Sequence, residues 1–281
     1  MKKIGIIVNK AKDIEFKYTS LIVQKLLEKG FQAIVEQDVK ACISLPALPS
    51  ASVIADSDFI ICVGGDGTFL KVARQAYVHK KPVLGINKGT VGFLAEVEAK
   101  DIEWAIDKIA DGDFHIQPRM VLEVEVIRQG EKVFEDIAIN DAVVSRMALS
   151  RILRLKVMLD EKYVDSFPGD GIIVSTPTGS TGYSLSAGGP IVQPDMKLMV
   201  ISPICAHILY SRSFIVSDSR TVKVSIDENG EISAMLTLDG QEGFALQQGD
   251  LVCARASRNN VFFASVSQVN YYDVLRSKIH S

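Results

Sequence analysis

The sequence is poor in the residues that build metal sites, disulfides and membrane spans. Its 281 residues include four cysteines, four histidines and one tryptophan. The cysteines lie far apart without a CxxC pair and the histidines are equally scattered, so neither a zinc site nor a disulfide framework is indicated. No apolar segment approaches the roughly 18 residues that span a bilayer, and the first expected strand starts near the N-terminus without a signal-peptide core. We expect a cytoplasmic protein with reduced cysteines and no membrane partner.

The chain also lacks a strong net charge. Its formal charge is -3 at pH 7, which gives no general attraction to nucleic acid or to an anionic membrane, so an anionic ligand must be held by local geometry. Apolar side chains are abundant, because 47% of the residues are hydrophobic. This is enough for one large domain or two ordinary ones with a substantial core. Together these observations favour a globular protein that acts on a small molecule.

One glycine-rich stretch, residues 64–68 (GGDGT), separates an apolar run from a segment with helical character. Three glycines in four positions let backbone N–H groups crowd against an anion at a helix N-terminus, where the helix dipole also favours negative charge. Asp66 would repel a bound phosphate, so we expect it to face a metal ion or a hydroxyl group about to lose its proton, as in a kinase. The alternative is a tight turn after a buried strand. The stretch lacks both the dinucleotide-fingerprint spacing and the P-loop lysine.

The first third of the chain alternates strands with helices. Residues 18–26 carry apolar side chains at helical spacing, whereas residues 44–52, with prolines and serines, read as a loop. Apolar runs predict strands at 4–8, 32–36, 59–63 and 83–86. Strands that alternate with helices form parallel sheets, and ligands bind beyond the carboxyl ends of such strands. Residues 64–68 lie at such an end.

The hydrophobic pattern changes to period two in the second half. Apolar and polar residues alternate at 121–126, 153–157 and 222–226, with turn signals between these runs. One face of each strand is therefore buried and the other is wet. This pattern predicts antiparallel β structure, a sandwich of two sheets.

The change of pattern predicts two domains. We expect an α/β domain at residues 1–118, completed by residues 257–281, and an all-β sandwich domain at residues 119–256. Residues 271–280 regain helical character. Because a lone helix cannot leave its apolar face in water, we expect this helix to pack on the first domain.

A second glycine-bearing loop, residues 85–94 (GINKGTVGFL), follows the last strand of the first third. It is either a turn that packs Phe93 into the core or a loop beside residues 64–68. In the second reading, Phe93 or Leu94 offers an apolar face to a nucleobase. Position in the sequence does not decide between these readings.

Residues 170–190 are crowded with glycine, serine and threonine around Tyr183. A linker would be polar throughout, whereas this segment includes the buried-looking run 172–174. Buried hydroxyl groups need hydrogen-bond partners, so a plain core is costly as well. We read the segment as a binding surface where hydroxyls and amides meet a polar ligand while Tyr183 packs against a ring.

Taken together, these motifs resemble the NAD kinase family from end to end. The GGDGT loop alone is shared with diacylglycerol and sphingosine kinases and, more distantly, with phosphofructokinases, whereas the serine- and threonine-rich segment separates NAD kinases from the lipid kinases. The similarity rests on residues 64–68 (GGDGT), 85–94 (GINKGTVGFL), 140–141 (ND), 175–190 (STPTGSTGYSLSAGGP) and 239–241 (DGQ). It implies transfer of the terminal phosphate of ATP to the adenosine 2′-hydroxyl of NAD, giving NADP, in a cleft between the two domains.

The resemblance also implies roles for individual residues. Asp66 lies at the adenosine 2′-hydroxyl as the proton acceptor, and Lys71 lies close to the phosphates. Asn140 and Asp141 occupy the family's Asn-Glu position, and because aspartate is one methylene shorter than glutamate, about 1.5 Å of reach is lost. Asp170 is suited to accept from a carboxamide. The implied substrate-binding residues are Gly64, Gly65, Gly67, Thr68, Lys71, Phe93, Asn140, Asp141, Arg151, Asp170, Thr178, Thr181, Gly182, Tyr183, Ser186 and Gln241.

Two rival functions stay open on the sequence. A lipid kinase would share the GGDGT loop but needs an apolar acceptor surface, which the polar residues 175–186 do not offer. A non-catalytic dinucleotide sensor would keep the binding residues and could lose the base, yet Asp66 is present.

Cofactor and assembly follow from the chemistry and from the resemblance. Phosphoryl transfer needs charge neutralisation, so Mg²⁺ should accompany ATP, and the sequence shows no metal site built from protein side chains alone. The resemblance implies a homodimer or homotetramer, with Arg151 and Gln241 in some members reaching across a subunit interface. The sequence does not decide whether polyphosphate replaces ATP or whether NADH is accepted.

Overall fold

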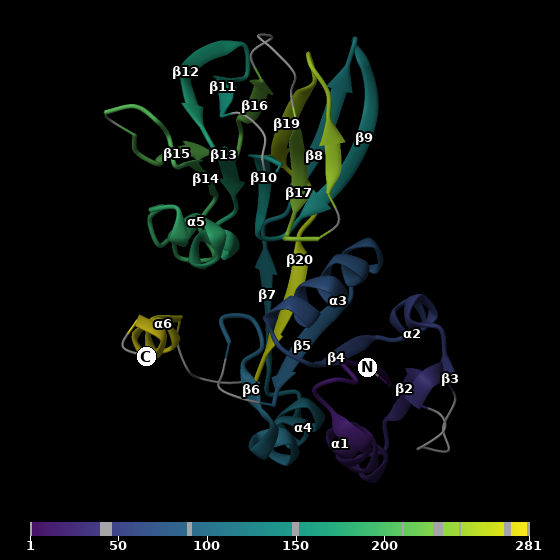
Figure 1. Ribbon diagram of the computed structural model, residues 1–281. Coiled ribbons are helices and arrows are strands. Elements are labelled where there is room, and N and C mark those ends of the chain that lie inside the picture. Colours follow the sequence, from purple (N-terminus) through teal and green to yellow (C-terminus); the bar gives the residue numbers. More distant parts are fainter. Residues whose placement is uncertain are drawn as a thin grey trace. The chain divides into compact units, whose positions relative to one another are not determined.

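The computed structural model divides the chain into two compact units (Figure 1). The first unit comprises Met1–Pro118 and Val261–Ser281, and the second comprises Arg119–Asn260. The first unit is thus built from two separate stretches of the chain and the second from one. The structure describes residues 2–39, 47–88, 92–147, 152–209, 211–226, 233–241, 243–266 and 271–279.

A mostly parallel sheet forms the centre of the first unit, in the order β3-β2-β1-β4-β5-β20-β7, with β6 paired to β5. Its strands are β1 (Lys3–Val8), β2 (Gln32–Glu36), β3 (Ala47–Leu48), β4 (Phe59–Val63), β5 (Pro82–Asn87), β6 (Val97–Glu98), β7 (His115–Arg119) and β20 (Val261–Ser265). The helices of this unit are α1 (Lys17–Glu28), α2 (Ser50–Asp56), α3 (Asp66–His79), α4 (Ile102–Asp111) and α6 (Tyr271–Ile279). Strands β1, β2, β4, β5 and β20 pair in parallel, so their carboxyl ends share one edge.

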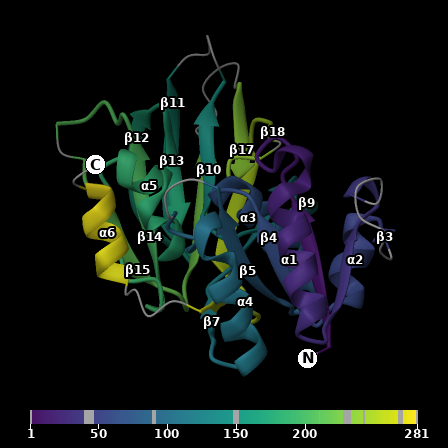
Figure 2. The same cartoon turned by 90° about the horizontal axis from the view of Figure 1, so that it is seen from below.

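Helices cover both faces of this sheet. Side chains along a strand alternate between the two faces, so a strand can pack against helices on both sides. Ile4 and Ile6 of β1 are fully buried in a cluster with Ile22 of α1 and with residues of α4, and α1 contacts α4 (Figure 2). Gly5 points to the other face, where a Cβ would lie 2.9 Å from Val53 of α2. Burial from both sides explains why β4 is buried along its whole length and reads as an unbroken apolar run.

The second unit consists of two antiparallel sheets, in the orders β15-β14-β13-β10-β17-β18 and β12-β11-β16-β19-β8-β9. The strands of the first sheet are β10 (Asp141–Arg146), β13 (Gly171–Ser175), β14 (Leu198–Ile204), β15 (Phe214–Ser217), β17 (Ala234–Leu238) and β18 (Phe244–Leu246). Those of the second are β8 (Leu122–Arg128), β9 (Glu131–Ala138), β11 (Leu153–Leu159), β12 (Lys162–Gly169), β16 (Thr221–Ile226) and β19 (Leu251–Ala256). A short 3-10 helix, η4 (Thr178–Thr181), and α5 (Tyr183–Ser186) lie between β13 and β14.

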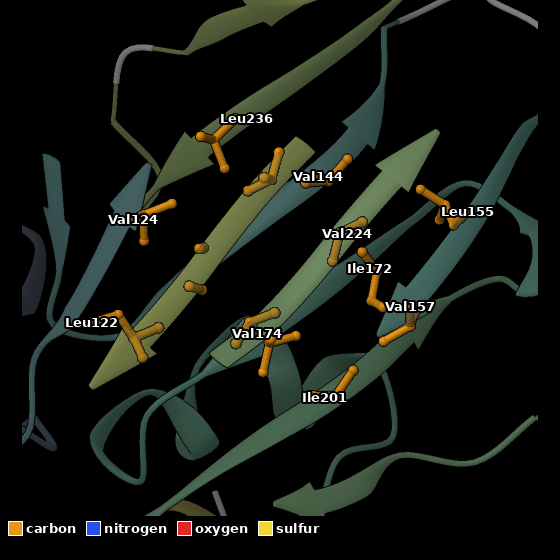
Figure 3. Packing of buried hydrophobic residues seen from close by; sticks show 14 of the residues in the cluster. Leu122, Val124, Val144, Leu155, Val157, Ile172, Val174, Ile201, Val224 and Leu236 are labelled. Atoms are coloured by element: carbon orange, nitrogen blue, oxygen red, sulfur yellow. The ribbon is translucent and has the colours of Figure 1, made fainter. Parts of the chain in front are cut away.

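Apolar side chains from both sheets form one core in this unit. Figure 3 shows Leu122 and Val224 of one sheet together with Val144 and Ile172 of the other. Along β8 buried residues alternate with partly exposed ones, as expected for a strand with one face on the core. The predicted fold class, an α/β domain followed by antiparallel β structure, is confirmed.

The segment expected as a loop at residues 44–52 is partly regular in the structure. Strand β3 begins at Ala47 and helix α2 at Ser50, whereas residues 44–46 lie outside the described residues. Val53 and Ile54 of α2 are fully buried. Their packing outweighs the turn-forming residues from which the loop was predicted.

Helix α6 occupies the C-terminal stretch where helical character was expected. Each side chain described in it, residues 271–278, is at least partly exposed. Its packing on the first domain therefore stays a prediction. Among the described residues, no helix is both long and apolar enough to cross a membrane.

Candidate active site

The glycine loop turns the chain sharply from β4 into α3. A Cβ on Gly64 would lie 2.6 Å from the Cβ of Thr68, closer than side-chain atoms approach, so the turn needs glycine there. Asn9 Nδ2 donates to Thr68 Oγ1 over 2.9 Å and ties the loop to the end of β1. Lys12 Nζ lies 2.5 Å from where a Cβ of Gly65 would stand. A cation therefore borders the amide-rich start of α3.

Asp66 is the first residue of α3, but its carboxylate turns toward the second loop. Oδ2 accepts from the N–H of Phe93 over 3.1 Å. Oδ1 accepts from the N–H of Leu94 over 3.4 Å and from that of Ala95 over 3.1 Å. Backbone amides of residues 93–95 therefore hold the negative charge.

The first unit thus brings together most of its predicted site residues. Residues 64–68 and Phe93 meet through Asp66, and Phe93 is half-buried. Lys71 follows on α3 with an exposed side chain. Residues 89–91 of the second loop lie outside the described residues.

In the second unit, Asn140 and Asp141 form the turn that enters β10, and Asp239 holds this turn. The Asp239 carboxylate accepts from the N–H of Asn140 over 2.7 Å, from that of Ile139 over 2.9 Å and from that of Asp141 over 3.2 Å. In return the N–H of Asp239 donates to the carbonyl of Asp141. Asp239 itself adopts a φ of 53°, in the left-handed region, just before Gly240. The residue that holds the Asn140 turn therefore has an unusual backbone conformation.

Several polar atoms beside this turn have no hydrogen-bond partner among the described residues. Asn140 Oδ1 and Thr178 Oγ1 are buried without a hydrogen-bond partner in the described part of the chain. The Asp141 side chain is buried as well, and its Oδ2 lies 3.9 Å from where a Cβ of Gly182 would stand. Burial, and after it the charge of Asp239, raises the pKa of Asp141 to about 7. Buried polar groups seldom go unpaired, so this group of atoms calls for a polar ligand.

Most hydroxyls of the serine- and threonine-rich segment are used within the protein, which limits the binding surface expected there. Thr176 Oγ1 donates to the carbonyl of Ile139 over 2.6 Å, and Ser180 Oγ donates to that of Pro177 over 2.7 Å. These bonds fix the segment against the Asn140 turn. The Thr178 hydroxyl is the exception among its neighbours.

Close approach explains Gly179 in this segment. A Cβ on Gly179 would lie 2.1 Å from the carbonyl oxygen of Asn140, whereas one on Gly182 would make an ordinary contact, 3.7 Å from Asn140 Nδ2. The segment therefore packs its backbone directly against the Asn140 turn. Tyr183 and Ser186, on α5, are exposed, whereas Thr181 is half-buried.

The remaining predicted residues lie at other points of the second unit. Asp170 forms an ion pair with Arg146, with Nε and Oδ1 separated by 2.7 Å, so the partner of this carboxylate was missed from the sequence. The N–H of Gln241 donates to the carbonyl of Leu238 over 3.0 Å. Arg151 lies outside the described residues.

Sequence reasoning also missed three groups that shape the site. Asp239 served only as part of the DGQ motif, although an aspartate before glycine at a strand end is a signal for a turn. The amides of residues 93–95 have no side-chain signal at all. The third omission is Lys12, a lone lysine near the end of β1 with nothing in its neighbours to mark it.

The chain has an aspartate inside a glycine loop at a helix N-terminus, and its second unit has buried polar groups without a partner among the described residues. This combination is typical of kinases that phosphorylate a hydroxyl group. Two protein-family models identify which kind of kinase this is. Residues 4–114 match the ATP-NAD kinase N-terminal domain, and residues 139–266 match the ATP-NAD kinase C-terminal domain. The chain belongs to the ATP-NAD kinase family.

Curated relatives and solved structures agree with this assignment. The NAD kinase of Acetivibrio thermocellus is 45% identical, with 100% of this chain and 98% of that protein covered, and the NAD kinase of Ruminiclostridium cellulolyticum is 42% identical with the same coverage. A yeast NADH kinase crystallised with NADH has a TM-score of 0.87 at 24% identity, covering 98% of this chain and 86% of that one. An Archaeoglobus fulgidus NAD kinase in complex with ATP has a TM-score of 0.77 at 24% identity, covering 99% and 98%. The two structures support the fold.

Family membership confirms the resemblance seen in the sequence. The chain is an enzyme for the ATP-dependent phosphorylation of NAD. Neither the lipid kinase nor the non-catalytic sensor finds support in these comparisons.

Proposed function

We propose that the enzyme transfers the terminal phosphate of ATP to the adenosine 2′-hydroxyl of NAD and that Asp66 accepts the hydroxyl proton. In this step the hydroxyl O–H bond breaks, a bond forms between that oxygen and the γ-phosphorus, and the bond from phosphorus to the β,γ-bridging oxygen breaks, which yields NADP and ADP. The observation that carries the proposal is the aim of the Asp66 carboxylate. It turns away from the amides of its own loop, and Oδ2 accepts only one N–H from the 93–95 segment, so lone pairs remain for a hydroxyl.

The rest of the first unit would serve the phosphates. The amides of Gly65 and Gly67 lie at the start of α3, where the helix dipole favours an anion. The N–H of Gly64 donates to the carbonyl of Ile86 and that of Thr68 to the carbonyl of Gly65, each over 2.9 Å, so these two residues shape the loop. Lys71 is exposed and free to reach a phosphate oxygen. These groups stabilise charge that develops during transfer, which is where enzymes of this kind obtain most of their rate.

The second unit would hold the dinucleotide. Within the described ranges, Asn140 Oδ1 and the Thr178 hydroxyl have no hydrogen-bond partner, and the buried Asp141 carboxyl lies beside them. Ribose hydroxyls and adenine amino groups are the donors that these oxygens require. Contacts of Asp170, Thr181, Gly182, Tyr183, Ser186 and Gln241 with the ligand stay proposals that rest on the resemblance.

Magnesium, the phosphate donor and the assembly are proposed from the chemistry of phosphoryl transfer and from the family. Among the described residues there is no cluster of three or more His, Cys, Asp or Glu side chains suited to a metal ion. We therefore assign the ion to the phosphates of ATP, where it neutralises charge. ATP is taken as the donor because the matching family models describe ATP-NAD kinases. A homodimer or homotetramer rests on the family resemblance, and a cytoplasmic location rests on the expectation drawn from the sequence.

Two analogues of NAD test the assignment of the acceptor. With ATP labelled in its γ-phosphate, 2′-deoxy-NAD should bind but never gain label, because it lacks only the reacting oxygen. The matched control, 3′-deoxy-NAD, keeps that oxygen and should be labelled. Labelling of 2′-deoxy-NAD, or of diacylglycerol micelles in place of NAD, would overturn the proposal.

A further inference from the structure

Gly92 lies where no larger residue fits. A Cβ built on it would stand 2.0 Å from Asp66 Oδ1 and 2.7 Å from the Asp66 carboxyl carbon. Both distances are well inside van der Waals contact. Its backbone does not adopt the left-handed conformation that would by itself require glycine. Position 92 therefore has to be glycine because a side chain there would occupy the space of the Asp66 carboxylate.

The segment after Gly92 is shaped to meet this carboxylate. The N–H of Gly92 donates to the carbonyl of Ala95 over 3.0 Å, which closes a tight turn. This turn directs the next three amides at Asp66, whose two oxygens accept all of them. We infer that residues 92–95 form a backbone clamp that positions the Asp66 carboxylate, and that position 92 must be glycine for the clamp to close.

The clamp is fixed at its far end as well. Glu96 accepts from the N–H of Val266 and from Ser265 Oγ, both over 2.7 Å. Ser265 ends β20, so the clamp is tied to the sheet rather than left as a mobile loop. Ala95 is fully buried, which leaves the amides of the clamp little freedom.

The clamp makes the two carboxylate oxygens unequal. Oδ1 accepts two amides and would stand 2.0 Å from a Cβ at position 92, whereas Oδ2 would stand 2.7 Å from it and accepts, among the described residues, only the N–H of Phe93. Oδ2 is therefore the oxygen that faces the acceptor hydroxyl. Because Phe93 is also the residue expected at the nucleobase, a ligand that shifts Phe93 moves a donor of the clamp with it. Gly92 is thus a positioning residue that acts through Asp66.

This inference rests on the proposed role of Asp66, so a stability measurement tests the clamp separately from catalysis. Gly92→Ala, Asp66→Ala and the double variant are compared by thermal unfolding. The clash needs both groups, so Gly92→Ala should lower Tm by about 3 to 10 °C in the wild type, as overpacking does, and have almost no effect beside Asp66→Ala. If Gly92→Ala fails to fold, folding of the double variant supports the clamp equally well. Equal losses in both backgrounds, or a double variant that also fails to fold, would overturn it.

A kinetic cycle then tests positioning. Gly92→Ala should lower kcat for NAD about 10²-fold, the usual cost of misplacing a catalytic group by about 1 Å, with KM for ATP nearly unchanged. In an Asp66→Asn enzyme, already slowed by about 10² to 10⁴, Gly92→Ala should cost nothing more. Full turnover by Asp66→Asn would show that Asp66 is not the base. The comparison of unfolding temperatures would then test the clamp by itself. A slow Asp66→Asn with an unimpaired Gly92→Ala would reject the clamp and keep the base.

Discussion

Two aspartates of the candidate site, Asp66 and Asp141, have opposite surroundings. Three backbone amides donate to Asp66, whereas no group among the described residues donates to the Asp141 carboxylate. Asp141 is buried next to the negative charge of Asp239, and its pKa is raised to about 7. A ligand hydroxyl that donates to Asp141 favours the ionised form. We therefore propose that the charge of Asp141 depends on whether a ligand hydroxyl donates to it.

The raised pKa of Asp141 predicts a pH-dependent effect on stability. An acid whose pKa is higher in the folded state adds stability below its unfolded value, near 3.8, and this stability is lost as the pH rises to about 7. Asp141→Asn stays neutral and escapes the loss. At pH 8.5 the variant should therefore unfold at a higher temperature than the wild type. Its free energy of unfolding should be higher by up to about 4 kcal/mol, since each unit of the pKa shift corresponds to about 1.4 kcal/mol.

Thermal unfolding of ligand-free protein between pH 5.5 and pH 9 measures this difference. It should shrink steadily as the pH falls below 7. A difference that stays constant with pH would show that Asp141 does not titrate in this range. The departure from the family's glutamate would then matter only through the length of the side chain.

At the scale of the element, the turn into β10 depends on a strand far away in the sequence. Asp239 follows β17, yet its carboxylate binds the N–H groups of residues 139–141. Strands β10 and β17 are paired neighbours. The turn that presents Asn140 and Asp141 is therefore held from the adjacent strand rather than by its own side chains.

This contact predicts a binding defect without a chemical one. Asp239→Asn replaces a charged acceptor by a neutral one, and hydrogen bonds to charged groups contribute about 1.5 to 3 kcal/mol. KM for NAD should rise about tenfold or more, since 1.4 kcal/mol corresponds to a factor of ten, while kcat changes little. Asp195→Asn, at an exposed position of the same unit, is the matched control. An unchanged KM in steady-state assays would show that the turn holds itself.

Sequence patterns predicted those features of the fold and site that are local in the chain. Apolar runs marked β4 and β5, period-two alternation marked β8, and the glycine loop was found because its residues are adjacent. The bond from Asp239 to Asn140 spans 99 positions, and no spacing rule reports such a contact. The clamp on Asp66 uses backbone amides, which every residue but proline carries. The hydroxyls of Thr176 and Ser180 were assigned to a ligand surface because sequence does not show which partner a hydroxyl finds.

At the scale of the whole molecule, the second unit is an insertion into the first. The chain leaves the first sheet after β7 and returns at β20, and these two strands are neighbours in that sheet. Strand β20 lies between β5 and β7. The first unit therefore lacks an inner strand without residues 261–265, whereas the second unit is complete in itself.

This arrangement predicts how fragments behave. Residues 119–260 expressed alone should give a cooperative thermal transition with a β-type circular dichroism spectrum. Residues 1–118 alone should not unfold cooperatively, because the gap between β5 and β7 leaves two open strand edges. The matched control joins residues 1–118 to 261–281 through a short flexible linker, and it should recover the transition. Cooperative unfolding of residues 1–118 alone would show that β20 is dispensable.

The position of β20 also bears on the order in which a nascent chain becomes structured. Domains usually fold one after another during translation, beginning at the N-terminus. Here the sheet that begins with Lys3 is missing a strand until residues 261–265 have been made, by which time every residue of the second unit has already been translated. The unit that is started first is thus the last to be finished, and a polypeptide still attached to the ribosome carries unpaired edges for most of its synthesis. Premature termination just before Val261 would release a folded β unit joined to an incomplete sheet, a species prone to edge-to-edge aggregation.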